Sequence, residues 1–358
     1  MDASVCFCGT PLVVARQTRQ CQSSRVCARS AGTAPRMQLT EVPPPANRKR
    51  GRPKKRPFGY VEPDRVRTGI AEVGPVERPV TERYLVVPDS EFSFRDRDPL
   101  DQMGLPDKSY ASAVWTQNVN HNMLWQTQLF AERQQAVLLM VHGFHTSGKS
   151  EVVHKLSSGF EPGGFASHAW KEPSVRESDY NFLWRYHRRV PRKGHVALWV
   201  RSWYEDVATA VLQDQVSAHE ADNRMYQIME LEHMLSLQGI KVVKLYLQIS
   251  DVVAFQRLEE TTVVPRGMWR VSRRDFEDKA RFNEYMKRWE HVIRTTSMDA
   301  APWYIVPSSI KWVRNTVASQ ILRDTFSSMN PQIPPEKIAS LLQTQLEPQR
   351  DTLTFQTM

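Results

Sequence analysis

One segment constrains the fold of this chain more than any other: the stretch HGFHTSGKS, residues 142–150. It follows the apolar run AVLLMVHG, residues 136–143, and precedes a segment with helical spacing, residues 149–158. Glycine, four residues, then Gly-Lys-Ser is typical of a loop whose backbone N–H groups surround phosphate oxygens at a helix N-terminus. In such a loop, Lys149 neutralises phosphate charge and Ser150 offers its hydroxyl to Mg²⁺. This strand-loop-helix unit predicts a parallel sheet around it.

Short apolar runs alternate with helical patterns after the loop. The runs have the length and composition of strands buried on both faces, and they cover residues 165–170, 195–202, 240–250 and 303–307. Helices are expected near residues 118–135, 174–189, 221–238, 251–260, 273–296 and 310–328, with a last helix and tail in residues 331–358. The alternation predicts a three-layer α/β domain over residues 108–330, with a parallel central sheet and helices on both faces.

The positive charge of the chain is concentrated at its N-terminus. The net charge is +9, but residues 1–60 hold 12 of the 48 Lys and Arg residues, opposed only by Asp2 and Glu41. The remaining 36 basic and 37 acidic residues nearly cancel. The predicted domain is therefore not expected to attract nucleic acid by charge. No apolar run approaches the ~18 residues of a membrane span, so no membrane partner is expected.

Residues 1–107 are predicted to be largely disordered and contain two features with open alternatives. Residues 1–37 are rich in Arg and Ser and poor in acid, as organellar transit peptides are; alternatively, translation starts at Met37. The sequence RKRGRPKK, residues 48–55, resembles an AT-hook, whose Arg-Gly-Arg-Pro centre lies in the minor groove of A·T-rich DNA. Basic runs also serve as localisation signals or solvated tails. Residues 60–107, rich in Pro and charge, are expected to form an extended arm.

These alternatives leave the compartment open. A start at Met37 favours the cytoplasm, whereas a translated leader favours an organelle. The basic tail, residues 48–56, would add DNA as a partner and the nucleus as a location.

From about residue 108 to 325, six blocks resemble, in order, the polyphosphate kinase 2 family. The three longest are WKEPSVRESDYNFLWRYHRRVPRKG (170–194), RSWYEDV (201–207) and APWYIVPSSIKWVR (301–314). The shorter blocks are LWQTQLFAE (124–132), LYLQIS (245–250) and VPRGMW (264–269), the last of which resembles a lid segment. The family consists of P-loop phosphotransferases, related in fold to thymidylate kinase, that move phosphate between inorganic polyphosphate and nucleotides.

The resemblance implies a P-loop kinase fold with a helical lid, Mg²⁺ or Mn²⁺ as cofactor, and a homo-oligomer. Lys149 and Arg201 are the implied catalytic residues, and Ser150 is the implied metal ligand. Polyphosphate and nucleotide are expected to bind the loop and the cations near strand ends and helix starts. This set comprises Gly143, His145, Gly148, Lys149, Ser150, Lys171, Arg185, Arg266, Arg270, Lys311 and Arg314.

The chain departs from the family pattern at positions that carry its chemistry. The family has Asp at the position of His145, and an acidic or amide residue at that of Val200. Because Mg²⁺ prefers oxygen ligands, these two changes predict a rate lower by about 10²–10³-fold, and their joint replacement by Asp is expected to raise activity. The remaining departures are Thr261 and Gly267 at lid cations, and Ser308 and Ser309 at acidic positions.

Glu205 and Asp206 follow the third strand and have two interpretations. They can replace the missing carboxylates, or they can have the structural role of the same Tyr-Glu-Asp-Val block in the family. Three functions therefore stay open at this point. The first is a phosphotransferase that uses polyphosphate or a nucleoside triphosphate as donor and a nucleoside mono- or diphosphate as acceptor. The second is a degenerate member that binds these ligands without turnover, and the third is an AT-hook DNA-associated protein with a nucleotide-sensing domain.

Overall fold

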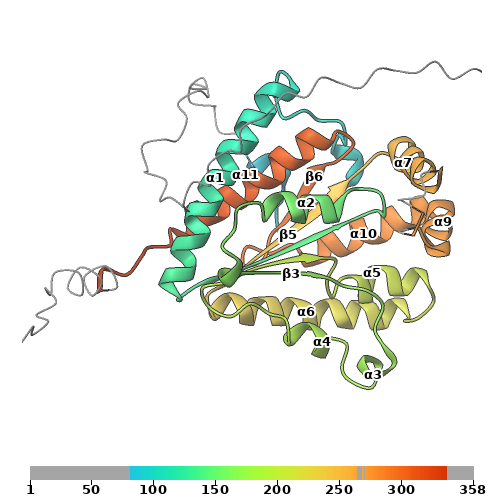
Figure 1. Ribbon diagram of the computed structural model, residues 1–358. Helices are drawn as coiled ribbons and strands as arrows, with labels where there is room; N and C mark the ends of the chain where they lie inside the picture. The colour runs from blue at the N-terminus through green and yellow to red at the C-terminus, as the bar shows by residue number, and fades with distance from the viewer. Residues whose placement is uncertain (1–80, 264–267, 270, 337–358) are drawn as a thin grey trace, which may run out of the picture. The chain divides into compact units, whose positions relative to one another are not determined.

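The computed structural model describes residues 81–263, 268–269 and 271–336 (Figure 1). The predicted leader 1–37, the AT-hook-like segment 48–55, and Arg266, Gly267 and Arg270 lie outside the described residues, as does most of the predicted C-terminal helix and tail. Within the described part, the chain has no helix that is both long and apolar enough to span a membrane.

The described residues form a six-stranded sheet with the order β1-β6-β5-β2-β4-β3. All neighbouring strands are parallel except β1, which runs antiparallel to β6. The five strands predicted from apolar runs are confirmed, and β1 is an addition. The strands are β1 (Leu85–Val86), β2 (Ala136–Gly143), β3 (Phe165–Ala169), β4 (Val196–Val200), β5 (Ile240–Gln248) and β6 (Trp303–Pro307).

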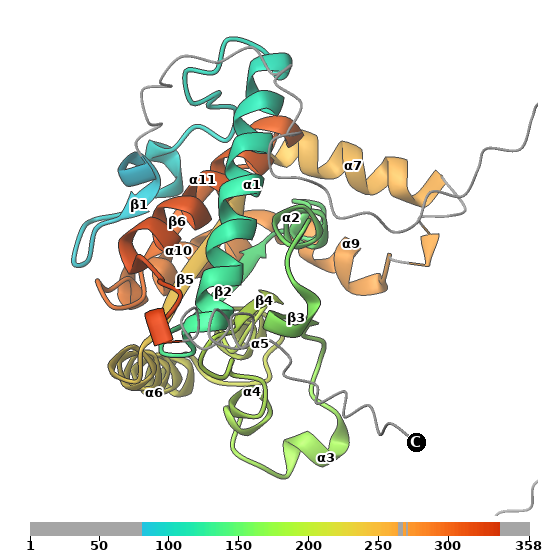
Figure 2. The ribbon, with the colours of Figure 1, turned by 60° about the vertical axis from the view of Figure 1, so that its left-hand side comes forward.

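Helices cover both faces of the sheet, as the strand-helix alternation predicted (Figure 2). β2 shows the reason most clearly, because it lies between β4 and β5 and all eight of its residues are buried. Its side chains alternate between two cores. Leu138 and Met140 belong to a core shared with α5, α6 and α10, whereas Leu139 and Val141 belong to one shared with α1, α2 and α11. The bounds of these six helices are α1 (Lys108–Glu132), α2 (Lys149–Leu156), α5 (Glu205–Leu212), α6 (Ala218–Leu237), α10 (Phe282–Thr296) and α11 (Lys311–Met329).

Among the remaining helices, the one predicted near residues 251–260 is confirmed, and two others differ from the prediction. The helix expected over residues 174–189 is two single turns, because Asn181 accepts the backbone N–H of Leu183 and forms a local turn between them. The helix expected over residues 273–296 breaks at Arg281, whose guanidinium donates to the carbonyl of Leu212. These helices are α3 (Val175–Ser178), α4 (Trp184–His187), α7 (Asp251–Val263) and α9 (Arg273–Ala280).

Residues 81–107 pack against the domain, which differs from the extended arm expected there. Phe92 and Phe94 are buried in the core on the α10 side of the sheet. Glu290 of α10 accepts hydrogen bonds from the hydroxyl of Ser93 and the backbone of Phe94. The side-chain amide of Gln248, at the end of β5, donates to the carbonyls of Phe94 and Arg97. Burial of these aromatic side chains thus stabilises the packing of the segment on the domain. The Pro-rich composition of the segment gave no indication of this packing.

Candidate active site

The phosphate loop connects β2 to α2 and depends on two glycines. Gly143 has φ +134° and Gly148 has φ +93°, conformations that side chains rarely adopt. A Cβ at Gly143 would lie 2.6 Å from the carbonyl oxygen of Leu247. A Cβ at Gly148 would lie 1.9 Å from Nη1 of Arg314. Both positions of the predicted motif are therefore needed for the loop to fit between β5 and α11.

Lys149 is buried beneath the loop, at the first residue of α2. Its Nζ donates to the carbonyls of Gly143, at 2.8 Å, and Phe144, at 2.9 Å. Burial and the nearby charge of Arg201 lower the pKa of Lys149 to about 7. A negatively charged group bound in the loop would favour the protonated lysine. Lys149 is thus positioned to respond to phosphate in the loop.

Arg314 lies behind the loop rather than in an open binding position. Its side chain is completely buried, and Nη1 donates to the carbonyl of Ser147 at 3.0 Å. Its Nη2 is 2.9 Å from a carboxylate oxygen of Glu151 in α2. The predicted ligand cation therefore fixes the loop and the following helix relative to α11.

Arg257 of α7 also holds the loop, and it was not predicted from the sequence. Its guanidinium donates to the carbonyls of Thr146 in the loop, at 3.3 Å, and Ser309 after β6, at 2.7 Å. The hydroxyl of Thr146 donates in turn to the carbonyl of Ala254 in α7. These backbone acceptors carry no sequence signal, so only the fold reveals the role of Arg257.

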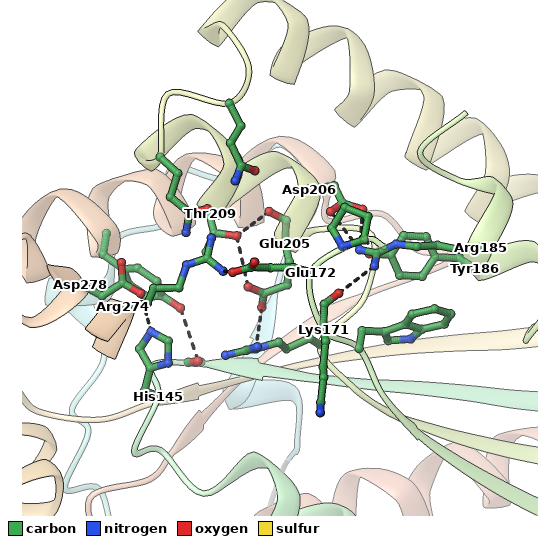
Figure 3. A pocket seen from close by; sticks show the side chains of 17 residues that line it. His145, Lys171, Glu172, Arg185, Tyr186, Glu205, Asp206, Thr209, Arg274 and Asp278 are labelled. Atoms are coloured by element: carbon green, nitrogen blue, oxygen red, sulfur yellow. Dashed lines mark hydrogen bonds and ion pairs between the residues drawn. The ribbon is translucent and has the colours of Figure 1, made fainter. Parts of the chain in front are cut away.

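A pocket opens at the carboxyl ends of β2, β3 and β4 (Figure 3). The sequence-predicted residues that line it are Gly143, His145, Lys171, Arg185 and Arg201. Its wall also contains residues from α9, among them Arg274 and Asp278. The structure thus brings five expected residues from four separate segments together, at the sheet edge where ligands of α/β proteins bind.

The other predicted residues lie outside this wall. Lys149 contacts the pocket only through the carbonyl of Gly143. Ser150 and Lys311 are exposed at the starts of α2 and α11, respectively. Val200 packs against the core shared with α1, α2 and α11 rather than lining the pocket.

Arg185 is held by an ion pair within the pocket wall. Its Nη2 lies 3.0 Å from Oδ1 of Asp206 and 2.6 Å from the hydroxyl of Tyr186, while Nη1 donates to the carbonyl of Lys171. The Tyr186 hydroxyl donates to Asp206 as well. Asp206 is therefore engaged in a structural network, which agrees with the second of its two interpretations.

Arg201 and Glu205 form a charged turn after β4. Arg201 has φ +67°, and its backbone N–H donates to the carbonyl of Val141 at 2.9 Å. Its Nε is 4.0 Å from Oε1 of Glu205, which is also 3.3 Å from Nδ1 of the buried His142. Burial raises the pKa of Glu205, but its interactions with His142 and Arg201 outweigh this and lower the pKa to about 2. Glu205 is consequently an ionised carboxylate in the pocket wall.

The side chain of His145 points at helix α9 and contacts two carboxylates of that helix. Its Nδ1 is 2.5 Å from Oδ1 of Asp275, and its Nε2 contacts Asp278. Burial raises the pKa of Asp275, but the hydrogen bond and charge of His145 lower it more strongly. The Ser-x-x-Asp capping box at Ser272 and Asp275 is visible in the sequence. Its partner lies about 130 residues away, and nothing local indicates it.

Comparison with known proteins supports the resemblance seen in the sequence blocks. The family model for polyphosphate kinase 2 (PPK2) matches residues 107–334. The chain is 32% identical to the AMP/ADP-polyphosphate phosphotransferase of Meiothermus ruber over 259 residues, which is 72% of this chain and 97% of the relative. It is 29% identical to an ADP-polyphosphate phosphotransferase of Rhodopseudomonas palustris, over 61% of this chain and 81% of the relative. The crystal structure of polyphosphate kinase 2 from Arthrobacter aurescens superposes with a TM-score of 0.69 at 28% identity, covering 75% of this chain and 97% of that one.

Proposed function

Because the chain belongs to the polyphosphate kinase 2 family, we propose that it is an enzyme that moves a phosphoryl group between inorganic polyphosphate and a nucleoside mono- or diphosphate. The observation that carries this proposal is the pocket itself. An intact glycine loop with its buried lysine lies beside a wall of cations at the carboxyl edge of a parallel sheet. Both donor and acceptor are polyanions, and such a wall is what they require.

The residues have distinct roles in this reaction. Phosphoryl transfer needs little covalent chemistry from the protein, so catalysis rests on positioning and on stabilising negative charge. The backbone N–H groups between Gly143 and Gly148 bind phosphate oxygens, and Lys149 neutralises their charge. Arg201 faces the same pocket and stabilises the transferring group. Lys171 and Lys311, both exposed, bind the outer part of the phosphate chain. Arg266 and Arg270 remain predictions from the resemblance.

A divalent cation, Mg²⁺ or Mn²⁺, fits the residues around the loop. Mg²⁺ is usually held by one or two carboxylates together with substrate phosphates, rather than by a complete protein cage. The described residues contain no cluster of three or more ligating His, Cys, Asp or Glu side chains, so substrate phosphates would have to complete the coordination of the ion. Ser150, exposed at the start of α2, or Glu205, an ionised carboxylate in the pocket wall, would hold the ion together with the phosphates. When bound, the ion neutralises charge on the transferring group.

The proposal is tested with purified protein, long-chain polyphosphate, Mg²⁺ or Mn²⁺, and AMP, ADP, GMP or GDP as acceptor. We expect a product nucleotide with one more phosphate, at a rate lowered about 10²–10³-fold by Lys149→Ala. Arg176→Gln, a change at an exposed cation outside the pocket wall, serves as the control and should leave the rate unchanged. Tight polyphosphate binding with no product from any acceptor would contradict the proposal and favour a binding protein without turnover.

A further inference from the structure

His145 occupies an unusual electrostatic position for a phosphate-loop residue. Each of its ring nitrogens contacts a different carboxylate of α9, Asp275 on one side and Asp278 on the other. Ionised carboxylates only accept hydrogen bonds, so each ring nitrogen of His145 can donate to an ionised carboxylate of α9 only when it bears a proton.

These contacts are the most buried polar link between α9 and the rest of the domain that the described residues show. The His145 side chain is 13% exposed and each aspartate side chain is 9% exposed. Two other ion pairs reach α9, from Glu172 to Arg274 and from Glu259 to Lys279, but both glutamates are about 70% exposed. Solvent weakens exposed pairs, whereas buried charge-assisted hydrogen bonds are strong.

The position of α9 matters because it forms one side of the phosphate pocket. Figure 3 shows Arg274 of α9 extending toward Glu172 and Glu205 in the pocket, while Asp278 of the same helix meets His145. Arg274 reaches over to Glu172, the residue after Lys171. A phosphate chain in the pocket would offer Arg274 a stronger, bidentate partner than this exposed carboxylate.

We propose that His145, Asp275 and Asp278 form a latch that holds α9, and with it Arg274, over the phosphate site during transfer. The inference rests on the proposed function, because the transferred phosphate is what α9 covers. His145 is thus a positioning residue that acts through α9. The loop has not simply lost a carboxylate; its carboxylates come from the neighbouring helix and are joined to the loop by the histidine.

The latch reverses the expected effect of restoring aspartate to the loop. From the sequence, His145→Asp in combination with Val200→Asp is expected to raise activity. In the structure, His145→Asp places a third carboxylate against Asp275 and Asp278, and like charges at this distance repel. The single substitution should therefore release α9 and lower activity.

The first experiment measures kcat and KM for polyphosphate in His145→Asp and Asp278→Asn, together with amide hydrogen exchange of residues 273–280. We expect kcat/KM to fall about tenfold or more in each variant, the fold-change that corresponds to losing one charge-assisted hydrogen bond. Exchange in α9 should accelerate to a similar extent, while exchange in α1 stays unchanged and shows that the domain is folded. Glu277→Gln is the matched control, since it removes a carboxylate from the exposed face of the same helix. It should leave kcat/KM within about twofold.

The second experiment tests whether the groups act together. His145→Gln with Asp278→Asn should cost no more than His145→Gln alone, because losing the histidine already removes both contacts with α9. His145→Asp with Asp278→His exchanges the two partners and should recover part of the activity lost in His145→Asp. Independent, multiplicative effects in the double variant, a gain of activity in His145→Asp, or unchanged α9 exchange would each overturn the latch.

The hydrogen-exchange arm needs no turnover, so it separates the two proposals. If the wild-type protein transfers no phosphate but His145→Asp still accelerates α9 exchange, the proposed function fails and the latch as a structural link stands. If the protein is active and α9 exchange does not respond, the latch fails and the proposed function stands.

Discussion

The two halves of the phosphate loop are held in different ways. The half leading into α2 is fixed by Arg314 and Arg257, whose guanidinium groups donate to backbone carbonyls of the loop. In the half leading out of β2, Lys149 donates to the carbonyls of Gly143 and Phe144, but two further contacts are between side chains: His145 with the carboxylates of α9, and Phe144 with the ring of Tyr285 in α10. Backbone acceptors are present whatever the loop sequence is, whereas side-chain partners disappear with one substitution. The half leading into α2 therefore depends mainly on backbone acceptors, whereas the half leading out of β2 also depends on side-chain pairs that a single substitution in the loop removes.

Arg314→Met should have the largest effect on stability, and it tests the half of the loop that leads into α2. The substitution keeps most of the buried volume but leaves the carbonyl of Ser147 without its donor and removes the ion pair with Glu151. We expect the free energy of unfolding to fall by about 3 kcal/mol, measured by urea denaturation. Arg273→Met, at a side chain that is 92% exposed, is the control and should change it by less than about 0.5 kcal/mol. Equal effects of the two substitutions would show that Arg314 does not stabilise the loop.

Gly148→Ala should come second, and a second glycine separates its two causes. Gly148 has φ +93° and its Cβ would displace Arg314, whereas Gly104 has φ +68° and open space around its Cβ. Backbone strain alone should cost about 1–2 kcal/mol in Gly104→Ala. We expect about 2–3 kcal/mol in Gly148→Ala, because the strain adds to a partial loss of the contacts that Arg314 makes with the loop. If Gly148→Ala and Gly104→Ala lower the free energy of unfolding equally, Arg314 moves away from the new Cβ without losing stabilising contacts.

Arg257→Met should destabilise less than Arg314→Met. Arg257 is only partly buried, so water can replace some of its bonds to Thr146 and Ser309. A loss of about 1–2 kcal/mol is expected in the same unfolding assay. A loss as large as that of Arg314→Met would show that the contact with α7 is as important for the loop as the contact with α11.

Asp278→Asn should have the smallest effect on stability although it lowers activity. His145 keeps Asp275 as a partner, so the free energy of unfolding should change by less than about 1 kcal/mol. Thermal melting and turnover measured on the same sample check this separation. A large drop in melting temperature would show that both halves of the loop are structural, and the contrast between them would disappear.

Most of the fold could be predicted because its strands are locally encoded. The run at residues 136–143 is apolar throughout and becomes the fully buried β2, and the glycines around the loop mark its turn. β1 escaped prediction because two residues give no periodicity, and its stability comes from pairing with β6. α5 was missed because its eight residues are fewer than the roughly 11–18 over which helical periodicity is recognised.

The site was predictable as a set of cations but not as a set of pairs. Arg201 and Lys171 follow apolar strands, so their place at the sheet edge could be inferred. Arg185 lies in the pocket wall and Arg314 behind the loop, and their carboxylate and carbonyl partners come from distant elements. At position 145, comparison with the family pattern indicated only a missing aspartate. The carboxylates of Asp275 and Asp278 reach His145 through the packing of α9 on the loop, which the sequence does not show.

The left-handed conformation of Arg201 has a consequence for selection experiments. At φ +67° the arginine has a backbone strain of about 1 kcal/mol that a glycine would relieve, although its contact with Glu205 offsets part of this strain. A library sorted only for heat resistance should enrich Arg201→Gly and discard the cation that faces the pocket. The residue at position 201 would then indicate the selection applied: glycine after selection for stability alone, and arginine after selection for activity.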